Sequence, residues 1–174
     1  MTNKELAELM FPNVKMTIED YEKKYPERNL PEGAVVSRYA PSPTGFVHMG
    51  NILSCFIENK LPEQTGGVFY LRIEDTDQKR EVEGAIDSIT GAIKMIGLNY
   101  NEGVIAPGVQ KGDYGPYIQS ERKEIYDTFA KYLIENGMAY PCFCNEKELE
   151  DIRDAQKDAK ARIGYYGEYA RCRH

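Results

Sequence analysis

The chain has 174 residues, of which 41% are hydrophobic and 29% are charged, a composition typical of a globular domain with a sizeable core. Its formal net charge of −6 excludes a protein that binds nucleic acid through overall positive charge, but does not exclude a local basic patch. No apolar run approaches the roughly 20 residues that span a bilayer, and the N-terminal sequence MTNKELAELMF is too polar for a secretory signal. We therefore expect a cytoplasmic protein whose four cysteines are free or metal-bound rather than disulfide-bonded.

Residues 1–33 differ from the sequence that follows and are expected to form an N-terminal extension. Thr17 followed by Asp20 is a helix-capping pattern, which predicts a short helix immediately after Thr17. The stretch from Pro26 to Gly33 is rich in polar and turn-forming residues and is interpreted as a linker into the first strand.

The segment RYAPSPTGFVHMGN at residues 38–51 is the most informative part of the sequence. It lies between a short strand-like run that starts at Val35 and the helix-like sequence ILSCFIENKL. Its prolines end the strand, and its glycines permit close approach of a ligand to the backbone. The free N–H groups and the positive dipole end at the start of the helix can hold a phosphate, with His48 beside them as a hydrogen-bond donor.

The next elements predict one βαβ unit with a parallel sheet and a right-handed crossover. A helix is expected at about 51–63, a turn at Gly66–Gly67 and a strand at Val68–Ile73, with Cys55 of the helix in the core. A second helix is expected at 80–97, with isoleucines on one face that packs on the sheet, and Gly97 at its end.

The last third of the chain is expected to contain two more helices. Ser120 is predicted to cap a helix that stops at Asn136–Gly137, although the polar residues around it also suit contact with a substrate or with RNA. Residues 138–144, MAYPCFC, are interpreted as a strand that enters an inserted region. Asn145 followed by Glu148 then predicts a capped helix that runs to about residue 162.

Two groups of charged side chains suit ligand groups of opposite charge. Arg38 on the first strand presents a planar guanidinium that can hold a carboxylate, unless it is simply a surface residue. Glu74, Asp75 and Asp77 crowd the end of the second strand, where ligands of open α/β sheets bind, and their charge suits an ammonium group. For the two aspartates, loop capping and pairing with nearby basic residues is an equally good interpretation.

Cysteines and a histidine near the C-terminus have the spacing of a zinc site. They form C-x-C and, after 27 intervening residues, C-x-H. The predicted ligands are Cys142, Cys144, Cys172 and His174. Three thiolates and an imidazole complete a tetrahedral shell without an open position, so we expect a structural Zn²⁺ rather than a catalytic one.

Three segments, in the same order along the chain, resemble motifs of a known family. They are PSPTGFVHMGN at 41–51, FYLRIEDTDQKR at 69–80 and GPYIQSERKEIY at 115–126. Each is similar to a motif of the bacterial-type glutamyl-tRNA synthetases, which are class I aminoacyl-tRNA synthetases, and HMGN stands where that family writes HIGH or HIGG. The resemblance covers most of the chain from Val35 onward.

The resemblance implies an α/β fold: the N-terminal half of a Rossmann-like class I synthetase catalytic domain with an inserted zinc-binding acceptor-stem region. The expected parts are an extension at 1–33, a nucleotide-binding half-domain at 34–137 and the start of the inserted subdomain at 138–174. The family's second half, which carries a KMSKS loop, and its anticodon-binding domain have no counterpart in this sequence. We therefore expect an N-terminal fragment that is inactive alone.

The activity implied by the resemblance is that of a glutamate–tRNA ligase. Glutamate and ATP form glutamyl-adenylate, and the glutamyl group then passes to the terminal adenosine of tRNA(Glu). The implied cofactors are ATP with Mg²⁺, and the structural Zn²⁺. The implied partners are L-glutamate and tRNA(Glu), with no membrane, and the protein is expected to be a monomer.

The resemblance also assigns roles to individual residues. The residues expected to bind glutamate are Arg38, Ala40, Ser42 and Glu74. The residues expected to bind ATP are Pro43, Thr44, Gly45, His48, Gly50 and Asn51. His48 and Asn51 are the expected catalytic residues, and they act by positioning and by stabilising charge on the α-phosphate rather than by moving a proton. Asn51 departs from the second histidine of HIGH, although its amide can still donate a hydrogen bond.

The same family commonly has a zinc site of the C-x-C and C-x-H type in this insertion. Related members replace the final histidine with a tyrosine, so Tyr165, Tyr166 and Tyr169 are alternative fourth ligands.

Three other functions fit part of the pattern. A glutamyl-queuosine tRNA(Asp) synthetase shares the PSP, histidine and zinc features, but typically has a serine at the place of Thr44 and an isoleucine at that of Thr76. Glutaminyl-tRNA synthetases write PPEP where this chain has APSP, and they lack this zinc site. A non-catalytic, zinc-stabilised RNA-binding module would have no use for His48 beside a helix start.

Overall fold

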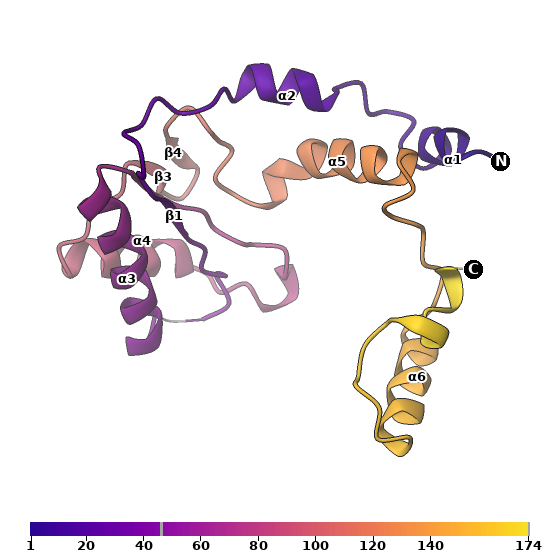
Figure 1. Cartoon of the computed structure of the whole chain (residues 1–174). Coiled ribbons are helices and arrows are strands. Elements are labelled where there is room, and N and C mark those ends of the chain that lie inside the picture. Colours follow the sequence, from indigo (N-terminus) through magenta and orange to yellow (C-terminus); the bar gives the residue numbers. More distant parts are fainter. Residues whose placement is uncertain (46, 174) are drawn as a thin grey trace. The chain divides into compact units, whose positions relative to one another are not determined.

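The computed structural model describes residues 1–45 and 47–173, and Figure 1 shows its elements in chain order. The chain divides into two compact units. One unit comprises residues 14–128, and the other combines residues 1–13 with the chain from residue 129 onward. Among the described residues, no helix combines the length and the apolar character needed to cross a bilayer.

A four-stranded sheet forms the centre of the unit at residues 14–128. Its strands, in spatial order, are β1 (Val36–Tyr39), β2 (Val68–Leu71), β3 (Glu102–Ala106) and β4 (Val109–Lys111). β1 and β3 both pair in parallel with β2, whereas β4 folds back antiparallel to β3. Parallel strands need a crossover between them, and α3 (Met49–Thr65) and α4 (Ala85–Met95) provide it. The predicted βαβ unit, with its parallel strands, is confirmed.

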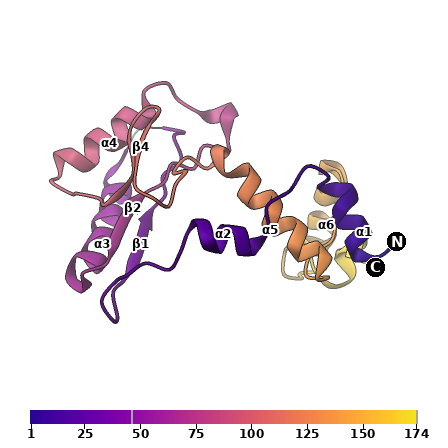
Figure 2. The same cartoon turned by 90° about the horizontal axis from the view of Figure 1, so that it is seen from above.

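The apolar core lies between the sheet and the two crossover helices, which cover the same face of the sheet (Figure 2). The central strand β2 contributes Phe69 and Leu71, and α4 contributes Ile89 and Ile93. Cys55 of α3 is 1% exposed, so its predicted place in the core is confirmed. The residues of β1 and β2 that alternate with these core positions, among them Arg38, point to the other face of the sheet, where a ligand can reach them.

α3 begins earlier than predicted, at Met49, because His48 is its N-cap residue in an extended conformation. The helix ends at Gly66, whose φ of 67° lies in the left-handed region. Gly67 then passes directly against the preceding strand, and a Cβ on Gly67 would lie 1.9 Å from the carbonyl oxygen of Val35. The predicted turn is confirmed, and its second glycine is required by this close approach.

The predicted helix at 80–97 is shorter than expected, and its predicted start was wrong. A 3-10 turn at Gln78–Arg80 and a left-handed Gly84, with φ of 76°, come before α4. The helix stops at Met95, and Ile96 is 37% exposed instead of joining the core face. Periodicity alone does not detect this late start, because the residues before Gly84 do not interrupt the apolar pattern.

Residues 14–33, which we call the N-terminal arm, contain α2 (Ile18–Lys24). The Asp20 N–H donates to the Thr17 hydroxyl at 3.2 Å, and the Thr17 N–H donates to the Asp20 carboxylate at 3.0 Å. The predicted capping pattern is therefore confirmed. The arm belongs to the same compact unit as the sheet.

The other unit is helical. It contains α1 (Asn3–Met10), the end of α5 (Lys123–Glu135) and α6 (Glu146–Asp158). An ion pair of 2.8 Å between Glu8 and Lys131 joins α1 to α5. The predicted cap of α6 is confirmed, since the Glu148 N–H donates to the Asn145 side chain at 2.9 Å.

Two expectations about the last third of the chain are wrong. Ser120 does not cap α5, which begins at Lys123 after a 3-10 turn, because its hydroxyl donates to Asp75 instead. Residues 138–144 do not form a strand, because no strand among the described residues pairs with them and Pro141 lacks an N–H to donate. α6 also ends at Asp158, earlier than expected, and Lys160 follows with φ of 52°.

Candidate active site and metal centre

A cavity of about 390 Å³ lies at the carboxyl end of β1, where the chain turns into α3. Six of the predicted site residues line it: Ala40, Ser42, Thr44, Gly45, His48 and Asn51. This is the end of a parallel sheet at which α/β proteins bind ligands, and the first turn of α3 adds free N–H groups and the positive end of the helix dipole. The arrangement suits an anionic ligand such as a phosphate.

His48 and Asn51 face this cavity from the start of α3. The Asn51 Oδ1 accepts a hydrogen bond from the His48 N–H at 3.2 Å, so Asn51 closes the first turn of the helix and holds His48 in place. A Cβ on Gly50 would lie 3.2 Å from the Cε1 and Nδ1 atoms of the His48 ring. The imidazole therefore lies over Gly50. Because Gly50 has no side chain, the ring has room to occupy this position.

The remaining predicted ATP residues lie elsewhere. Pro43 is fully buried behind the cavity, and its carbonyl accepts from the Val82 N–H at 2.9 Å. Gly50 does not line the cavity but lies beneath the His48 ring. Neither residue lines the cavity.

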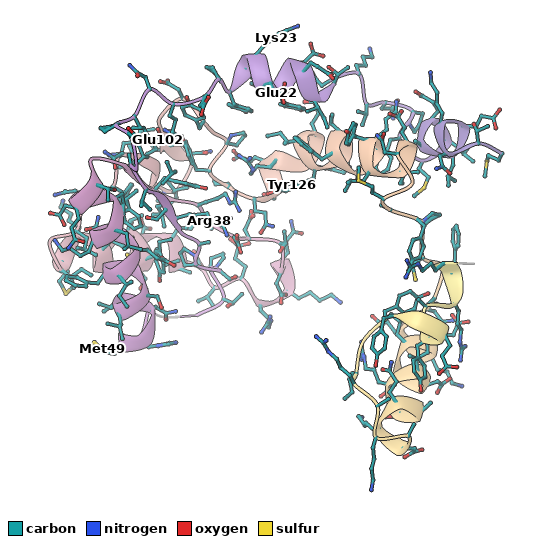
Figure 3. The ribbon with its side chains drawn as sticks, in the orientation of Figure 1. Glu22, Lys23, Arg38, Met49, Glu102 and Tyr126 are labelled. Carbon is teal, nitrogen blue, oxygen red and sulfur yellow. The ribbon has the colours of Figure 1, made fainter. Side chains whose placement is uncertain are left out.

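Arg38 and Glu74, two of the predicted glutamate-binding residues, contact each other. Oε1 of Glu74 lies 3.3 Å from a terminal nitrogen of Arg38 and 3.3 Å from one of Arg72. Figure 3 shows Arg38 on the side of the sheet that faces away from α3. The pair does not line the cavity, but the Glu74 N–H donates to the carbonyl of Pro41, which does.

Sequence reasoning did not give Arg72 a role in this cluster. Its Nε is buried and meets no acceptor within the described part of the chain, and its side chain is only 16% exposed. Two guanidinium groups against one carboxylate leave one positive charge, so the cluster suits an additional anion. The signal that could have found Arg72 is its place in the sequence, directly after β2 and two residues before Glu74.

Asp75 and Asp77 have structural partners. The Asp75 carboxylate accepts from the N–H and the hydroxyl of Ser120, at 2.8 and 2.5 Å. Asp77 accepts from the Arg80 side chain at 2.6 Å. For these two aspartates the interpretation as loop-stabilising groups fits the contacts.

Three of the four predicted metal ligands lie together. The sulfur atoms of Cys142, Cys144 and Cys172 lie within 4.8 Å of one another. The fourth, His174, lies outside the described residues. The Tyr165 hydroxyl is 3.3 Å from the Cys144 sulfur and accepts from the Cys172 N–H at 3.1 Å.

The surroundings of Cys172 favour its thiolate. Hydrogen bonds from the Tyr165 hydroxyl and from the Phe143 N–H lower the pKa of Cys172 to about 7. A thiolate is the form that binds metal, and three sulfurs with one more donor match the tetrahedral preference of zinc. The donor set therefore fits Zn²⁺.

A buried glutamine holds the loop that carries Tyr165. Gln156 is fully buried, donates to the Gly164 carbonyl at 2.7 Å and accepts from the Gly164 N–H at 3.0 Å. This two-point contact fixes the residue before Tyr165 relative to α6. The sequence offered no signal for it, because a glutamine inside a charged helix has the appearance of a surface residue.

Comparison with known proteins identifies the family. The family described as "tRNA synthetases class I (E and Q), catalytic domain" matches residues 34–173. A "Glutamate--tRNA ligase" of Clostridium beijerinckii is 52% identical over 174 residues, which is 100% of this chain and 32% of that protein. Another of the same name, from Acetivibrio thermocellus, is 50% identical over 171 residues, 98% of this chain and 31% of that protein. The chain thus spans about a third of the length of these relatives.

Solved structures give the same result. The crystal structure of a glutamate tRNA ligase from Elizabethkingia meningosepticum, in complex with its amino acid, has a TM-score of 0.66 and 36% identity; the match covers 79% of this chain and 26% of that one. The glutamate-tRNA synthetase of Elizabethkingia anophelis has a TM-score of 0.67 at the same identity, with 79% and 27% covered. The chain therefore belongs to the class I tRNA synthetases of the glutamate and glutamine (E and Q) group, and residues 34–173 correspond to part of their catalytic domain.

Proposed function

We propose that the chain carries the glutamate- and ATP-binding part of the catalytic site of a glutamate–tRNA ligase. The observation that supports this most directly is the cavity at the end of β1, which opens onto the first turn of α3. The cluster of Arg38, Arg72 and Glu74 is joined to that cavity through the Glu74–Pro41 hydrogen bond. One site thus offers an anion-binding helix start beside groups that complement an amino acid.

In the proposed reaction, an oxygen of the α-carboxylate of glutamate attacks the α-phosphorus of ATP. The new anhydride bond forms glutamyl-adenylate, and pyrophosphate leaves with the electron pair of the broken P–O bond. A ribose hydroxyl of the terminal adenosine of tRNA(Glu) then takes the glutamyl group, and AMP is released. ATP brings Mg²⁺, which would neutralise charge on its phosphates.

His48 and α3 would act on the first step by electrostatics. Negative charge develops on the α-phosphate oxygens as the carboxylate attacks, and a donor already in place stabilises it without reorganisation. The His48 imidazole and the first N–H groups of α3 are such donors. Asn51 holds His48 through the hydrogen bond to its N–H, while Thr44 and Gly45 would border the phosphates.

Charge balance supports glutamate as the amino acid. Arg38 would hold the side-chain carboxylate, and Glu74 would take the α-ammonium, with Ala40 and Ser42 beside them. Arg38, Arg72 and Glu74 together carry one net positive charge, and glutamate carries one net negative charge, so the occupied site is neutral. Glutamine would leave the positive charge uncompensated in a partly buried site, which disfavours it.

The region from residue 138 onward is proposed to be the inserted acceptor-stem region, after a nucleotide-binding half-domain at 34–137 and the extension at 1–33. We further propose that Zn²⁺ holds this region through Cys142, Cys144 and Cys172, with Tyr165 or His174 as the fourth ligand. The metal would have a structural role, because four protein ligands leave no open position. As a tRNA-charging enzyme the protein would act in the cytoplasm, and we propose a monomer.

The experiment that tests the proposal is calorimetric titration of the chain with a non-hydrolysable glutamyl-adenylate analogue and with its glutaminyl counterpart. We expect the glutamyl analogue to bind more tightly, and Arg38→Ala to abolish that preference while Arg153→Met, on the exposed face of α6, leaves it unchanged. Equal affinity for both analogues would contradict the assignment of glutamate. Absence of binding by either would contradict the proposed site as it stands in this chain.

A further inference from the structure

The N-terminal arm is fastened to the sheet unit by two groups of polar contacts. The Arg28 guanidinium forms a two-point ion pair with the Glu102 carboxylate, in which one N–O distance is 2.7 Å, and it also lies 3.6 Å above the ring of Tyr114. The Tyr25 hydroxyl donates to the Gly115 carbonyl, and the Tyr114 hydroxyl donates to the Pro26 carbonyl at 2.8 Å. The arm therefore contacts the loop at residues 112–120 through Tyr114 and Gly115.

The ion pair is well shielded, since the Arg28 and Glu102 side chains are 18% and 13% exposed. Burial alone would raise the pKa of Glu102, but hydrogen bonds from Arg28 and from the Tyr117 hydroxyl outweigh it and lower that pKa. A two-point, partly buried pair of this kind defines geometry as well as charge. Removal of Arg28 would leave the Glu102 carboxylate buried with one partner fewer.

Glu102 links the ion pair with Arg28 to the loop at residues 112–120. Its Oε2 accepts from the Tyr117 hydroxyl at 2.6 Å. A Cβ on Gly112 would lie 2.6 Å from the Glu102 Cγ and 2.7 Å from the Tyr117 hydroxyl, so the loop fits closely around this contact. Figure 3 labels Glu102 beside the chain that runs from Glu22 and Lys23 of α2 toward β1.

The loop also forms hydrogen bonds with the residues directly before and after Glu74. The Ile73 N–H donates to the Tyr117 carbonyl, and the Gln119 N–H donates to the Ile73 carbonyl, both at 2.9 Å. On the other side of Glu74, the Asp75 carboxylate accepts from the N–H and the hydroxyl of Ser120. The residues before and after Glu74 are therefore both held by the loop that the arm grips.

We propose that the arm is a positioning element of the catalytic site, in which Arg28 and Tyr25 fix the place of Glu74 through the loop at 112–120. The proposal rests on the proposed function in so far as Glu74 receives the α-ammonium of the amino acid. The arm lies outside the part matched by the catalytic-domain family, which begins at residue 34, whereas the Clostridium beijerinckii relative matches it over its whole length. The arm thus adds contacts that hold the loop at residues 112–120 to the part of the chain matched by the catalytic-domain family.

The first test is hydrogen exchange of backbone amides in the 174-residue chain, which needs no ligand. In Arg28→Met we expect the amides of Ile73, Gln119 and Ser120 to exchange about tenfold faster, because local opening of the loop becomes easier. Tyr25→Phe removes one hydroxyl and is expected to give a smaller increase at the same amides. Arg153→Met, an exposed arginine of α6, is the matched control and should leave them unchanged.

The second test separates positioning from general stability. Arg28→Met should weaken the glutamyl-adenylate analogue about tenfold, while an analogue that lacks the α-amino group should bind as it does to the unaltered chain. Arg28→Lys keeps the charge but loses the two-point geometry, so it should restore only part of the affinity.

The outcomes distinguish this inference from the proposed function. If the amides of Ile73, Gln119 and Ser120 exchange at unchanged rates in both Arg28→Met and Tyr25→Phe, the inference that the arm stabilises the loop is overturned. Equal weakening of the two analogues by Arg28→Met would overturn the positioning of Glu74. If the unaltered chain binds neither analogue, the proposed function fails, and the exchange rates still decide whether the arm holds the loop.

Discussion

Replacement of Gly50 by alanine should separate stability from ligand binding. Gly50 lies in the first turn of α3, where alanine is the better helix former, so Gly50→Ala should raise the free energy of unfolding by up to about 1 kcal/mol. Its Cβ, however, would lie 3.2 Å from two atoms of the His48 ring, closer than an unstrained contact. Because His48 is exposed, the ring can swing away from Gly50, and it then leaves its place beside the cavity.

The expected loss follows from the hydrogen bond that His48 would make to a phosphate. A hydrogen bond to a charged group contributes about 1.5–3 kcal/mol, so a displaced ring should weaken a non-hydrolysable ATP analogue by about tenfold or more. Calorimetric titration measures the affinity, and urea denaturation measures the stability. Gly91→Ala in α4 is the matched control, because a Cβ there meets nothing within 4 Å, and it should stabilise the protein without weakening the analogue. A Gly50→Ala protein with unchanged affinity would refute the role given to the His48 ring.

Further experiments test the close approach at Gly67, the burial of Cys55 and the proposed metal site. Gly67→Ala places a Cβ 1.9 Å from the Val35 carbonyl oxygen and should cost more than about 2 kcal/mol in urea denaturation, so an unchanged midpoint would contradict the close approach of the two segments. Burial, assisted by the nearby Glu58, raises the pKa of Cys55 from 9.0 to about 12, so iodoacetamide at pH 8, applied after a chelator has removed any bound Zn²⁺, should label the exposed Cys142 and spare Cys55. For the same reason the unfolded chain releases the Cys55 proton at lower pH than the folded chain, and stability should fall as the pH rises from 9 towards 12, with a smaller fall in Cys55→Ala. Removal of the proposed Zn²⁺ by a chelator, or Cys172→Ser, should unfold the part of the chain from residue 129 onward and leave the sheet unit at 14–128 intact by circular dichroism and hydrogen exchange; loss of the sheet unit as well would contradict a local structural role of the proposed metal.

Local patterns in the sequence predicted the elements around the site. The prolines and glycines at 41–50 marked the turn between β1 and α3, and the Gly66–Gly67 turn marked the return to β2. The spacing of Cys142, Cys144 and Cys172 likewise predicted that their sulfurs meet. In these cases the chemistry of a few neighbouring residues decides the structure, so the sequence alone carries the information.

Contacts between distant residues were not predicted. Arg28 and Glu102 are separated by 74 positions, and Ser120 binds Asp75 across 45 positions, and neither pairing follows from periodicity or capping rules. The strand predicted at 138–144 failed for a related reason, since a strand forms only where a partner accepts its backbone hydrogen bonds. The antiparallel strand β4 was also missed, because it is short and its pairing with β3 depends on the turn at Gly108.

The most direct test of the central claim is a crystal structure of the chain with the non-hydrolysable glutamyl-adenylate analogue bound. We expect the adenylate phosphate to lie at the first turn of α3 within hydrogen-bond distance of His48. We also expect the side-chain carboxylate of the analogue at Arg38 and its amino group at Glu74. An analogue bound away from the cavity at the end of β1, or in it with the carboxylate and amino ends exchanged, would contradict the account.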